Sequence, residues 1–213
     1  MRQSTPTTTP HLSNAGPRAR KRREKPGHWL AHLTTWLFVQ AGITAGMRVL
    51  DVGSSAGEVA LLLAELVGPT GSIVGVELHP ALLEAAQERT SRAGLTNVAW
   101  HTGDFCDLAL EQEFDAVVGR NSLIYLSDST AVLRQCLEYL RPDGVVVFQE
   151  VDKSVSEQLA QLVAAPSLVQ QGMLWASGDL RQGQVDHILA EHLEQHSLSP
   201  HFFMAGVWAR KAA

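Results

Sequence analysis

The segment from Val49 to Gly57 constrains the fold of this chain more than any other. An apolar run ends at the acidic residue Asp51, and two glycines, Gly53 and Gly57, follow before a helical pattern begins. A second acid, Glu77, ends the next apolar run, twenty residues beyond Gly57. A buried strand, a glycine turn, a helix and a second strand in this order predict an α/β fold.

The rest of the chain continues this alternation of apolar runs with helical patterns. Strands are expected at 47–52, 72–77, 98–102, 114–119 and 145–149, and helices at 29–41, 58–66, 80–93 and 129–140. Beyond residue 150, helices are expected at 157–164, 168–176 and 185–196, and a closing strand at 202–210. Such an alternation predicts a parallel sheet that is covered by helices on both faces.

Length and composition fit one globular domain. The chain has 213 residues, of which 45% are hydrophobic and 18% charged. It contains no run of eighteen apolar residues, and residues 1–27 lack the apolar stretch of a secretory signal. Cys106 and Cys136 have no metal-type spacing and are expected to be unpaired thiols in a reducing compartment. We therefore expect a cytoplasmic protein without a membrane span.

Charge divides the chain near residue 26. Residues 1–26 hold seven Lys or Arg and one Glu, whereas residues 27–213 carry a net charge of −11. The first segment is rich in Ser, Thr and Pro and is expected to be a disordered basic tail ahead of a single domain at 27–213. Contact with nucleic acid or an anionic surface is the alternative role for this tail, although the acidic body argues against a broad nucleic-acid footprint.

Candidate ligand-binding residues lie where the expected strands end, because ligands of open α/β sheets bind beyond the carboxyl ends of the strands. These residues are Asp51, Gly53, Glu77, Asp104 and the pair Arg120 and Asn121. Glu77 can accept hydrogen bonds from both hydroxyls of a ribose. Asp104 can accept from an amino group, and Phe105 offers a flat ring face. Gly53 and Gly57 are expected to let the backbone approach the ligand, whose space a side chain would occupy.

A glycine turn followed by an acid is also found in dinucleotide-binding folds. Here the spacing is Gly-x-x-x-Gly, without the third glycine of the dinucleotide pattern. Asp51 precedes the first glycine by two residues, where its charge would repel a pyrophosphate and attract an ammonium group. The turn therefore favours a ligand with an amino group over a dinucleotide.

Five segments in order resemble the motifs of class I S-adenosylmethionine-dependent methyltransferases, over roughly residues 47–150. They are Val49–Gly57, Val74–Glu77, Gly103–Phe105, Phe114–Arg120 and the turn Leu140–Gly144. Within the family, the chain looks most like stand-alone bacterial enzymes related to quinone-biosynthesis C-methyltransferases and small-molecule O-methyltransferases.

This resemblance implies a Rossmann-like three-layer α/β/α sandwich with a mostly parallel sheet of seven strands, in the order 3-2-1-4-5 with an antiparallel last strand. It implies S-adenosyl-L-methionine as cofactor and a small molecule as methyl acceptor. Asp51 and Gly53 would face the methionine moiety and Glu77 the ribose, while Asp104 and Phe105 would face the adenine. The other residues carried over to the cofactor site are Ser54, Ser55, Gly57, Leu78, Arg120 and Asn121.

The chain departs from the family pattern in three places. Ser55 replaces the usual middle glycine, so at most a reduced cofactor affinity is expected unless that position needs a positive φ. Asp143 replaces the first glycine of a later turn, which suits the turn preference of Asp. After Glu150 the chain is short, so we expect a reduced helical cap at 151–200 and one sheet strand fewer. The pocket would then be open, or closed by a partner such as a second copy in a homodimer.

Catalytic residues are harder to assign. Methyl transfer depends mainly on holding the acceptor in line with the methyl carbon, and a base is needed only for a weakly nucleophilic acceptor. The candidate bases are Glu150, His32 and Tyr125. No metal is expected, because the segment from His192 to His196 does not match the His-Glu-x-x-His zinc pattern.

Three other functions are compatible with these residues. The first is a protein that binds S-adenosylmethionine without transferring its methyl group. The second is a nucleic-acid methyltransferase guided by the basic tail, although the Asp/Asn-Pro-Pro-Tyr motif for amino groups of bases is absent, since residues 120–123 read Arg-Asn-Ser-Leu. The third is an oxidoreductase that binds a nicotinamide dinucleotide.

Overall fold

The computed structural model describes residues 28–110, 113–125, 128–151, 168–177 and 203–212. Its helices are α1 (His28–Gln40), α2 (Glu58–Val67), α3 (Pro80–Arg92) and α4 (Ser129–Tyr139), with short 3₁₀ turns η1 (Phe105–Asp107) and η2 (Leu123–Tyr125). Its strands are β1 (Arg48–Val52), β2 (Ser72–Glu77), β3 (Val98–Thr102), β4 (Phe114–Arg120), β5 (Leu140–Glu150), β6 (Leu168–Ser177) and β7 (Phe203–Lys211).

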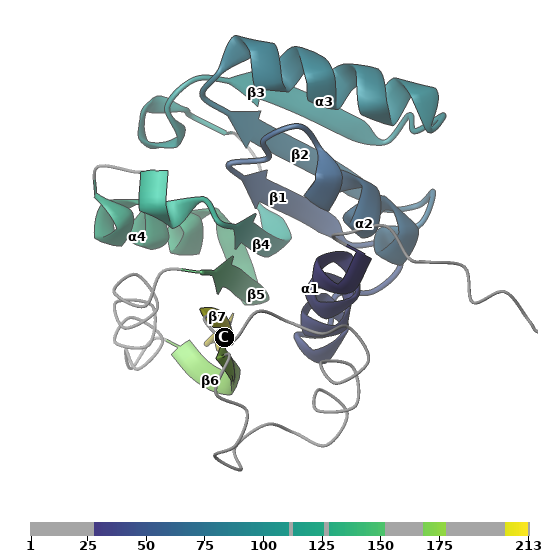
Figure 1. Ribbon diagram of the computed structural model, residues 1–213. Helices are drawn as coiled ribbons and strands as arrows, with labels where there is room; N and C mark the ends of the chain where they lie inside the picture. The colour runs from purple at the N-terminus through teal and green to yellow at the C-terminus, as the bar shows by residue number, and fades with distance from the viewer. Residues whose placement is uncertain (1–27, 111–112, 126–127, 152–167, 178–202, 213) are drawn as a thin grey trace, which may run out of the picture.

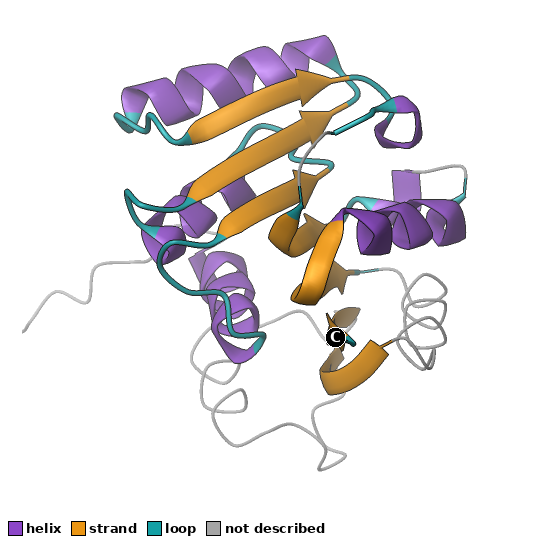
Figure 2. Cartoon of the chain, turned by 180° about the vertical axis from the view of Figure 1, so that it is seen from behind, coloured by secondary structure: helices purple, strands orange, loops and turns teal. Residues whose placement is uncertain are grey.

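The strands form one seven-stranded sheet in the order β3-β2-β1-β4-β5-β7-β6 (Figure 1). The first five strands are parallel, and β7 runs antiparallel between β5 and β6. The predicted strand order and the antiparallel last strand are confirmed. Helices α1, α2 and α3 lie on one side of the sheet and α4 on the other, which gives the expected three layers (Figures 1 and 2).

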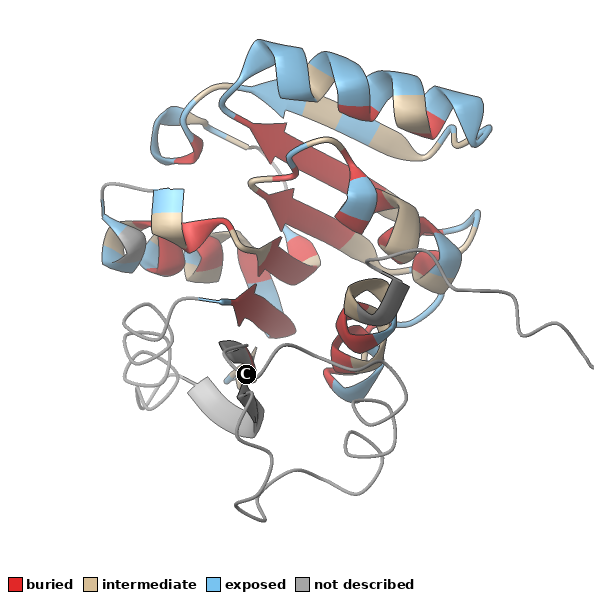
Figure 3. Cartoon of the chain, in the orientation of Figure 1, coloured by how far each residue is buried: buried red, intermediate tan, exposed pale blue. Residues whose placement is uncertain are grey.

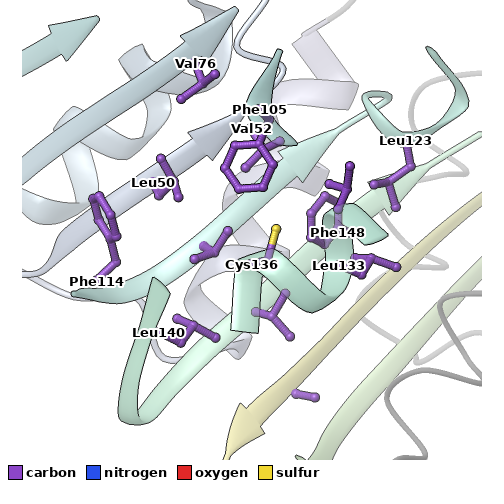
Figure 4. Packing of buried hydrophobic residues seen from close by; sticks show 14 of the residues in the cluster. Leu50, Val52, Val76, Phe105, Phe114, Leu123, Leu133, Cys136, Leu140 and Phe148 are labelled. Atoms are coloured by element: carbon purple, nitrogen blue, oxygen red, sulfur yellow. The ribbon is translucent and has the colours of Figure 1, made fainter. Parts of the chain in front are cut away.

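Successive residues of the central strands are buried on opposite sides of the sheet, as the alternation of side chains along a strand requires. In β1, Val49 packs in a cluster with Leu37 of α1 and Leu63 of α2. Its neighbour Leu50 packs in the second cluster with Leu133 of α4 (Figure 4). Because both sides are covered, the central strands are mostly apolar and are buried along most of their length (Figure 3).

The segment expected as a helix at 168–176 is instead strand β6, and this prediction was wrong. Strand β6 pairs with β7 from Leu168 to Ser177, with a register shift between Gln170 and Gly172. A short apolar run fits a helix and a buried strand equally well, so only the pairing partner decides between them. The glycine inside the run, which marks the shift in register, was the signal for a strand. The sheet strand expected to be missing is therefore present.

Strand β5 begins at Leu140 rather than at residue 145, because the expected turn is a bulge within the strand. Phe114 of β4 pairs with Leu140 and Ala116 with Val145, so residues 141–144 are inserted between two paired positions. Asp143 adopts a positive φ of 63° in this bulge, which explains why the family pattern has glycine there.

Some predictions fall outside the described residues. These are the basic tail at 1–26 and the helices at 157–164 and 185–196. Within the expected cap at 151–200, the part that the structure describes beyond residue 151 is the sheet strand β6. Cys106 and Cys136 are both unpaired thiols. None of the helices in the described ranges has the length and apolar character needed to span a membrane.

Candidate cofactor site

A cavity of about 460 Å³ lies beyond the carboxyl ends of β1, β2, β3 and β4. The loops that follow these four strands converge on it, as the sequence predicted. The predicted residues that line it are Gly53, Ser54, Ser55, Glu77, Leu78, Asp104, Phe105, Arg120, Asn121 and Tyr125. Asp51, Gly57, Glu150 and His32 do not line it. Lining residues that the sequence analysis missed include Glu58, His79, Leu82 and Ser122.

The carboxylate of Glu77 is fixed by two backbone amides. Its Oε2 atom accepts a hydrogen bond of 2.8 Å from the amide of Ser55, and its Oε1 atom accepts one of 2.9 Å from the amide of His79. Glu77 is buried at the end of β2, yet it lines the cavity. Each carboxylate oxygen has further lone pairs, so the group can still accept hydrogen bonds from two neighbouring hydroxyls of a ligand.

The glycine turn after β1 is held against β2. The amides of Gly53 and Ser54 both donate to the carbonyl of Val76, at 3.0 and 2.9 Å. Ser55 has a φ of 48°, so the position of the missing glycine does adopt the left-handed conformation. The serine is therefore accommodated at some backbone cost.

The two glycines of this turn serve protein packing. A Cβ atom at Gly53 would lie 2.6 Å from the Cβ atom of Ser122, and one at Gly57 would lie 3.0 Å from Ala86 of α3. Both residues also have positive φ values, 72° and 79°. The first atoms that a side chain at either position would meet thus belong to the protein, and the expectation that it would also occupy the ligand's space stays a prediction.

Asp51 lies behind the cavity wall and is fully buried. Its pKa is raised to about 7, mainly by burial and to a smaller extent by the charge of Glu77, while Ser54 and the charge of Arg120 act to lower it. The hydroxyl of Ser54 donates to the main-chain oxygen of Asp51 at 2.8 Å. Within the described part of the chain, neither carboxylate oxygen has a hydrogen-bond partner. The site therefore contains a buried acid that a nearby positive charge would stabilise.

The end of β4 places polar groups on the other side of the glycine turn. The guanidinium group of Arg120 contacts the carboxylate of Glu58 at 2.7 Å. Asn121 has a φ of 52°, and its amide donates to the carbonyl of Gln149 at 2.8 Å. The Oδ1 atom of Asn121 and the Oγ atom of Ser122 are buried without a hydrogen-bond partner among the residues described. Ser122 could have been found only as the next polar residue after the Arg120–Asn121 pair.

At the end of β3 the two predicted residues differ in exposure. Asp104 is exposed, and its Oδ1 atom accepts a hydrogen bond of 2.9 Å from the amide of Cys106, which caps η1. Phe105 is buried, and its ring contacts the ring of Tyr139 edge to face, with centroids 5.8 Å apart. Phe105 lines the cavity, but most of its ring belongs to the core beneath α4.

The three candidate bases have different environments. Tyr125 lines the cavity and is 80% exposed. Glu150 is fully buried, and its Oε1 atom accepts hydrogen bonds from the amides of Ser122 and Leu123 at 3.0 and 3.1 Å. His32 is exposed on α1 and does not line the cavity. Glu150 thus positions the loop after β4, and Tyr125 alone of the three lines the cavity.

Comparison with known proteins agrees with this arrangement. A family model described as "Methyltransferase domain" matches residues 43–195. An arsenite methyltransferase from Aquipseudomonas alcaligenes is 34% identical over 134 residues, which cover 58% of this chain and 38% of the relative. Nocamycin O-methyltransferase from Saccharothrix syringae is 33% identical over 146 residues, covering 68% and 47%. A demethylmenaquinone methyltransferase from Staphylococcus aureus is 31% identical over 124 residues, covering 58% and 51%.

Solved structures share the fold. The cyclase SpnF superposes with a TM-score of 0.70 at 21% identity, over 90% of this chain and 85% of that protein. The arsenic methyltransferase CrArsM from Chlamydomonas reinhardtii superposes with a TM-score of 0.55 at 23% identity, over 80% and 65%. The chain spans about half the length, or less, of the curated relatives described above. Because the family model covers more than half of the residues, the chain belongs to the family of methyltransferase domains.

Proposed function

We propose that the cavity binds S-adenosyl-L-methionine and that the protein transfers its methyl group to a small-molecule acceptor. Family membership supports the reaction class. The relatives support the acceptor class, because they are named for arsenite, nocamycin and demethylmenaquinone, which are small molecules. The fold alone does not decide the reaction, since a cyclase shares it.

The observation that carries the proposal is the order of chemical groups along the sheet edge. Asp104 follows β3, Glu77 ends β2, Gly53 follows β1 and Arg120 ends β4, and these strands are adjacent in the sheet. Neighbouring strands are about 4.8 Å apart, so the four strand ends span roughly 14 Å. Along S-adenosylmethionine, the adenine comes first and the ribose second, and the α-carbon at the far end carries both the ammonium group and the carboxylate, which fits the Gly53 and Arg120 side of this edge.

The residues present fit this cofactor. Glu77 is held so that it can accept from the two ribose hydroxyls. Asn121 and Ser122 line the cavity, and each has a buried polar atom without a hydrogen-bond partner among the described residues, so each residue has a polar group left for a ligand. The buried carboxyl of Asp51 behind the glycine turn would favour the ammonium group of the ligand electrostatically.

When bound, the cofactor supplies an electrophilic methyl group on a sulfonium. The chain's own contribution is to hold the cofactor and to orient an acceptor beyond it. Tyr125, exposed and lining the cavity, is the group best placed to accept a proton from an acceptor or to orient it. Glu150 acts through the loop that it positions. The cytoplasmic location, the homodimer that closes the pocket and the lack of a nucleic-acid substrate stay predictions.

Calorimetry with S-adenosylmethionine and S-adenosylhomocysteine tests the cofactor assignment. The wild type is expected to bind both, and Glu77→Ala to lower both affinities roughly ten- to a hundredfold, because hydrogen bonds to a charged group are lost. Glu65→Ala, which removes an exposed acid of α2, serves as the control and should leave binding unchanged. Failure of the wild type to bind either ligand would overturn the proposal.

Methyl transfer is tested separately with S-adenosylmethionine labelled in its methyl group. The acceptors are arsenite, a demethylmenaquinone analogue and a panel of phenols. Transfer to any of them supports the acceptor class. Binding without transfer to any acceptor in a broad screen would instead favour a protein that binds the cofactor and does not transfer its methyl group.

A further inference from the structure

We propose that Arg120 selects ligands that carry a carboxylate, and that Glu58 occupies Arg120 until such a ligand displaces it. This inference rests on the proposed function, because the carboxylate would be that of the methionine part of the cofactor. It adds a specificity-determining residue and an internal competitor to the cavity.

Arg120 is the one lysine or arginine among the described residues that line the cavity. The same cavity is lined by the acids Glu58, Glu77 and Asp104, and Asp51 lies behind it. An anionic group that enters this acidic cavity is therefore favoured only where it can reach the guanidinium group. Planar guanidinium groups bind carboxylates through paired hydrogen bonds, which gives this residue the right chemistry.

Arg120 is held in place by contacts with β5 and α1. Its backbone pairs with Gln149 in the sheet. Its Nη1 atom lies 3.4 Å from the hydroxyl of Thr34 on α1, to which it donates. Only 10% of its side chain is exposed. A guanidinium group buried to this extent needs an anionic partner at all times, because leaving a buried charge unpaired is costly.

Glu58, unlike Arg120, has a largely exposed side chain. It is the first residue of α2, and 63% of its side chain is exposed. Its Oε2 atom lies 2.7 Å from Arg120, while its Oε1 atom lies 3.4 Å from Arg89 of α3. An exposed carboxylate loses little when a contact breaks, since water solvates it well. Glu58 can therefore leave Arg120, remain beside Arg89, and yield its place to a ligand carboxylate.

The test compares S-adenosylmethionine with decarboxylated S-adenosylmethionine, which keeps the adenosine, the sulfonium and the ammonium group. The wild type is expected to prefer the carboxylated ligand. Arg120→Gln should lower its affinity for that ligand tenfold or more and leave the decarboxylated one within about twofold. Arg120→Lys keeps the charge and should retain part of the preference, which tests the proposal even if the glutamine variant folds poorly.

Removal of the Glu58 carboxylate, which competes for Arg120, should strengthen binding of the carboxylated ligand. Glu58→Gln is expected to raise the affinity for S-adenosylmethionine several-fold without changing that for the decarboxylated ligand. Glu88→Gln is a matched control, because Glu88 lies on α3, pairs with Arg92 and is also 63% exposed. It should change neither affinity.

These experiments distinguish failure of the Arg120 proposal from failure of the proposed function. If Arg120→Gln weakens both ligands equally, the residue is structural and this proposal fails. The proposal also fails if the wild type binds both ligands equally, or if Glu58→Gln does not strengthen binding of the carboxylated ligand. In each of these cases the proposed function still stands. If the wild type binds neither ligand, the proposed function fails too.

Discussion

The backbone amide of Ser55 donates a hydrogen bond of 2.8 Å to the Oε2 atom of Glu77, and this bond joins the turn after β1 to the end of β2. Ser55 directs its amide there because it adopts a positive φ of 48°. The conformation that glycine usually supplies at this position thus fixes the acid that we assign to the ribose. A serine can fill the position because it is small, at a backbone cost of roughly 1 kcal/mol.

This arrangement predicts how variants of Ser55 rank in stability. Ser55→Gly should change the free energy of unfolding by less than about 1 kcal/mol, because relief of backbone strain is offset by a more flexible unfolded chain. Ser55→Val should lower it by about 2 kcal/mol, since a β-branched residue tolerates a positive φ poorly. Urea unfolding measures both. A valine variant as stable as the glycine variant would contradict the assigned backbone conformation.

The sequence was sufficient for the part of the fold that carries the site. Apolar runs that end at Asp51 and Glu77, with glycine and proline between segments, predicted strands close to the observed bounds of β1 and β2. These signals are local, because a buried parallel strand is apolar along most of its length. The same locality explains the error at Leu168–Ser177, where the decisive fact is pairing with β7, a strand distant in sequence.

The sequence predicted many of the residues that line the cavity, but it did not predict the contacts between residues that are distant in the chain. Sequence placed Gly53 in the loop correctly, yet the atom that forbids a side chain there belongs to Ser122, almost seventy residues further on. Likewise, nothing local indicates that Glu150 binds the amides of Ser122 and Leu123 instead of facing the cavity. Such contacts depend on packing between elements, which patterns along the chain do not encode.

A comparison of Gly53 with Gly94 separates the energetic cost of a steric contact from the energetic cost of a positive φ. Both have a φ of 72°, but a Cβ atom at Gly53 would lie 2.6 Å from Ser122, whereas one at Gly94 would meet nothing within 4 Å. Gly94→Ala should therefore cost about 1 kcal/mol of unfolding free energy. Gly53→Ala should cost roughly 1–3 kcal/mol more, because Ser122 must move.

A second substitution checks the cause of this difference. Adding Ser122→Gly to Gly53→Ala removes the contacting Cβ atom and should restore part of the lost stability. Equal stability of Gly53→Ala and Gly94→Ala in urea unfolding would show that the close contact has no energetic consequence.

Glu150 is predicted to position a loop and not to act as a base. Glu150→Gln keeps an acceptor oxygen for the two amides and should cost about 1 kcal/mol of stability. Glu150→Ala leaves both amides unsatisfied and creates a cavity, so it should cost about 3 kcal/mol or more and weaken cofactor binding. Thermal unfolding and calorimetry measure these effects. A glutamine variant with wild-type stability and affinity that has lost methyl transfer would instead identify Glu150 as the base.

Asp51 makes stability depend on pH in a direction opposite to that of most carboxylates. Burial raises the pKa of its carboxyl group from 3.8 to about 7 in the folded protein. Between these values the folded state holds a proton that the unfolded chain has lost, so the free energy of unfolding falls as pH rises from about 4 to 7. Above pH 7 the effect is constant.

Asp51→Asn removes this dependence because its side chain does not titrate. The variant should gain stability relative to the wild type as pH rises, by an amount on the order of 4 kcal/mol between pH 4 and pH 8. Urea unfolding at several pH values gives the difference directly, and Glu65→Gln, an exposed acid of α2, should give a difference that stays flat. A difference for Asp51→Asn that is also flat, or that shrinks with pH, would mean that Asp51 ionises in the folded protein as readily as a solvated acid. Asp51 would then be fully charged at neutral pH, and no cost of burying its charge would remain for the ammonium group of a ligand to offset.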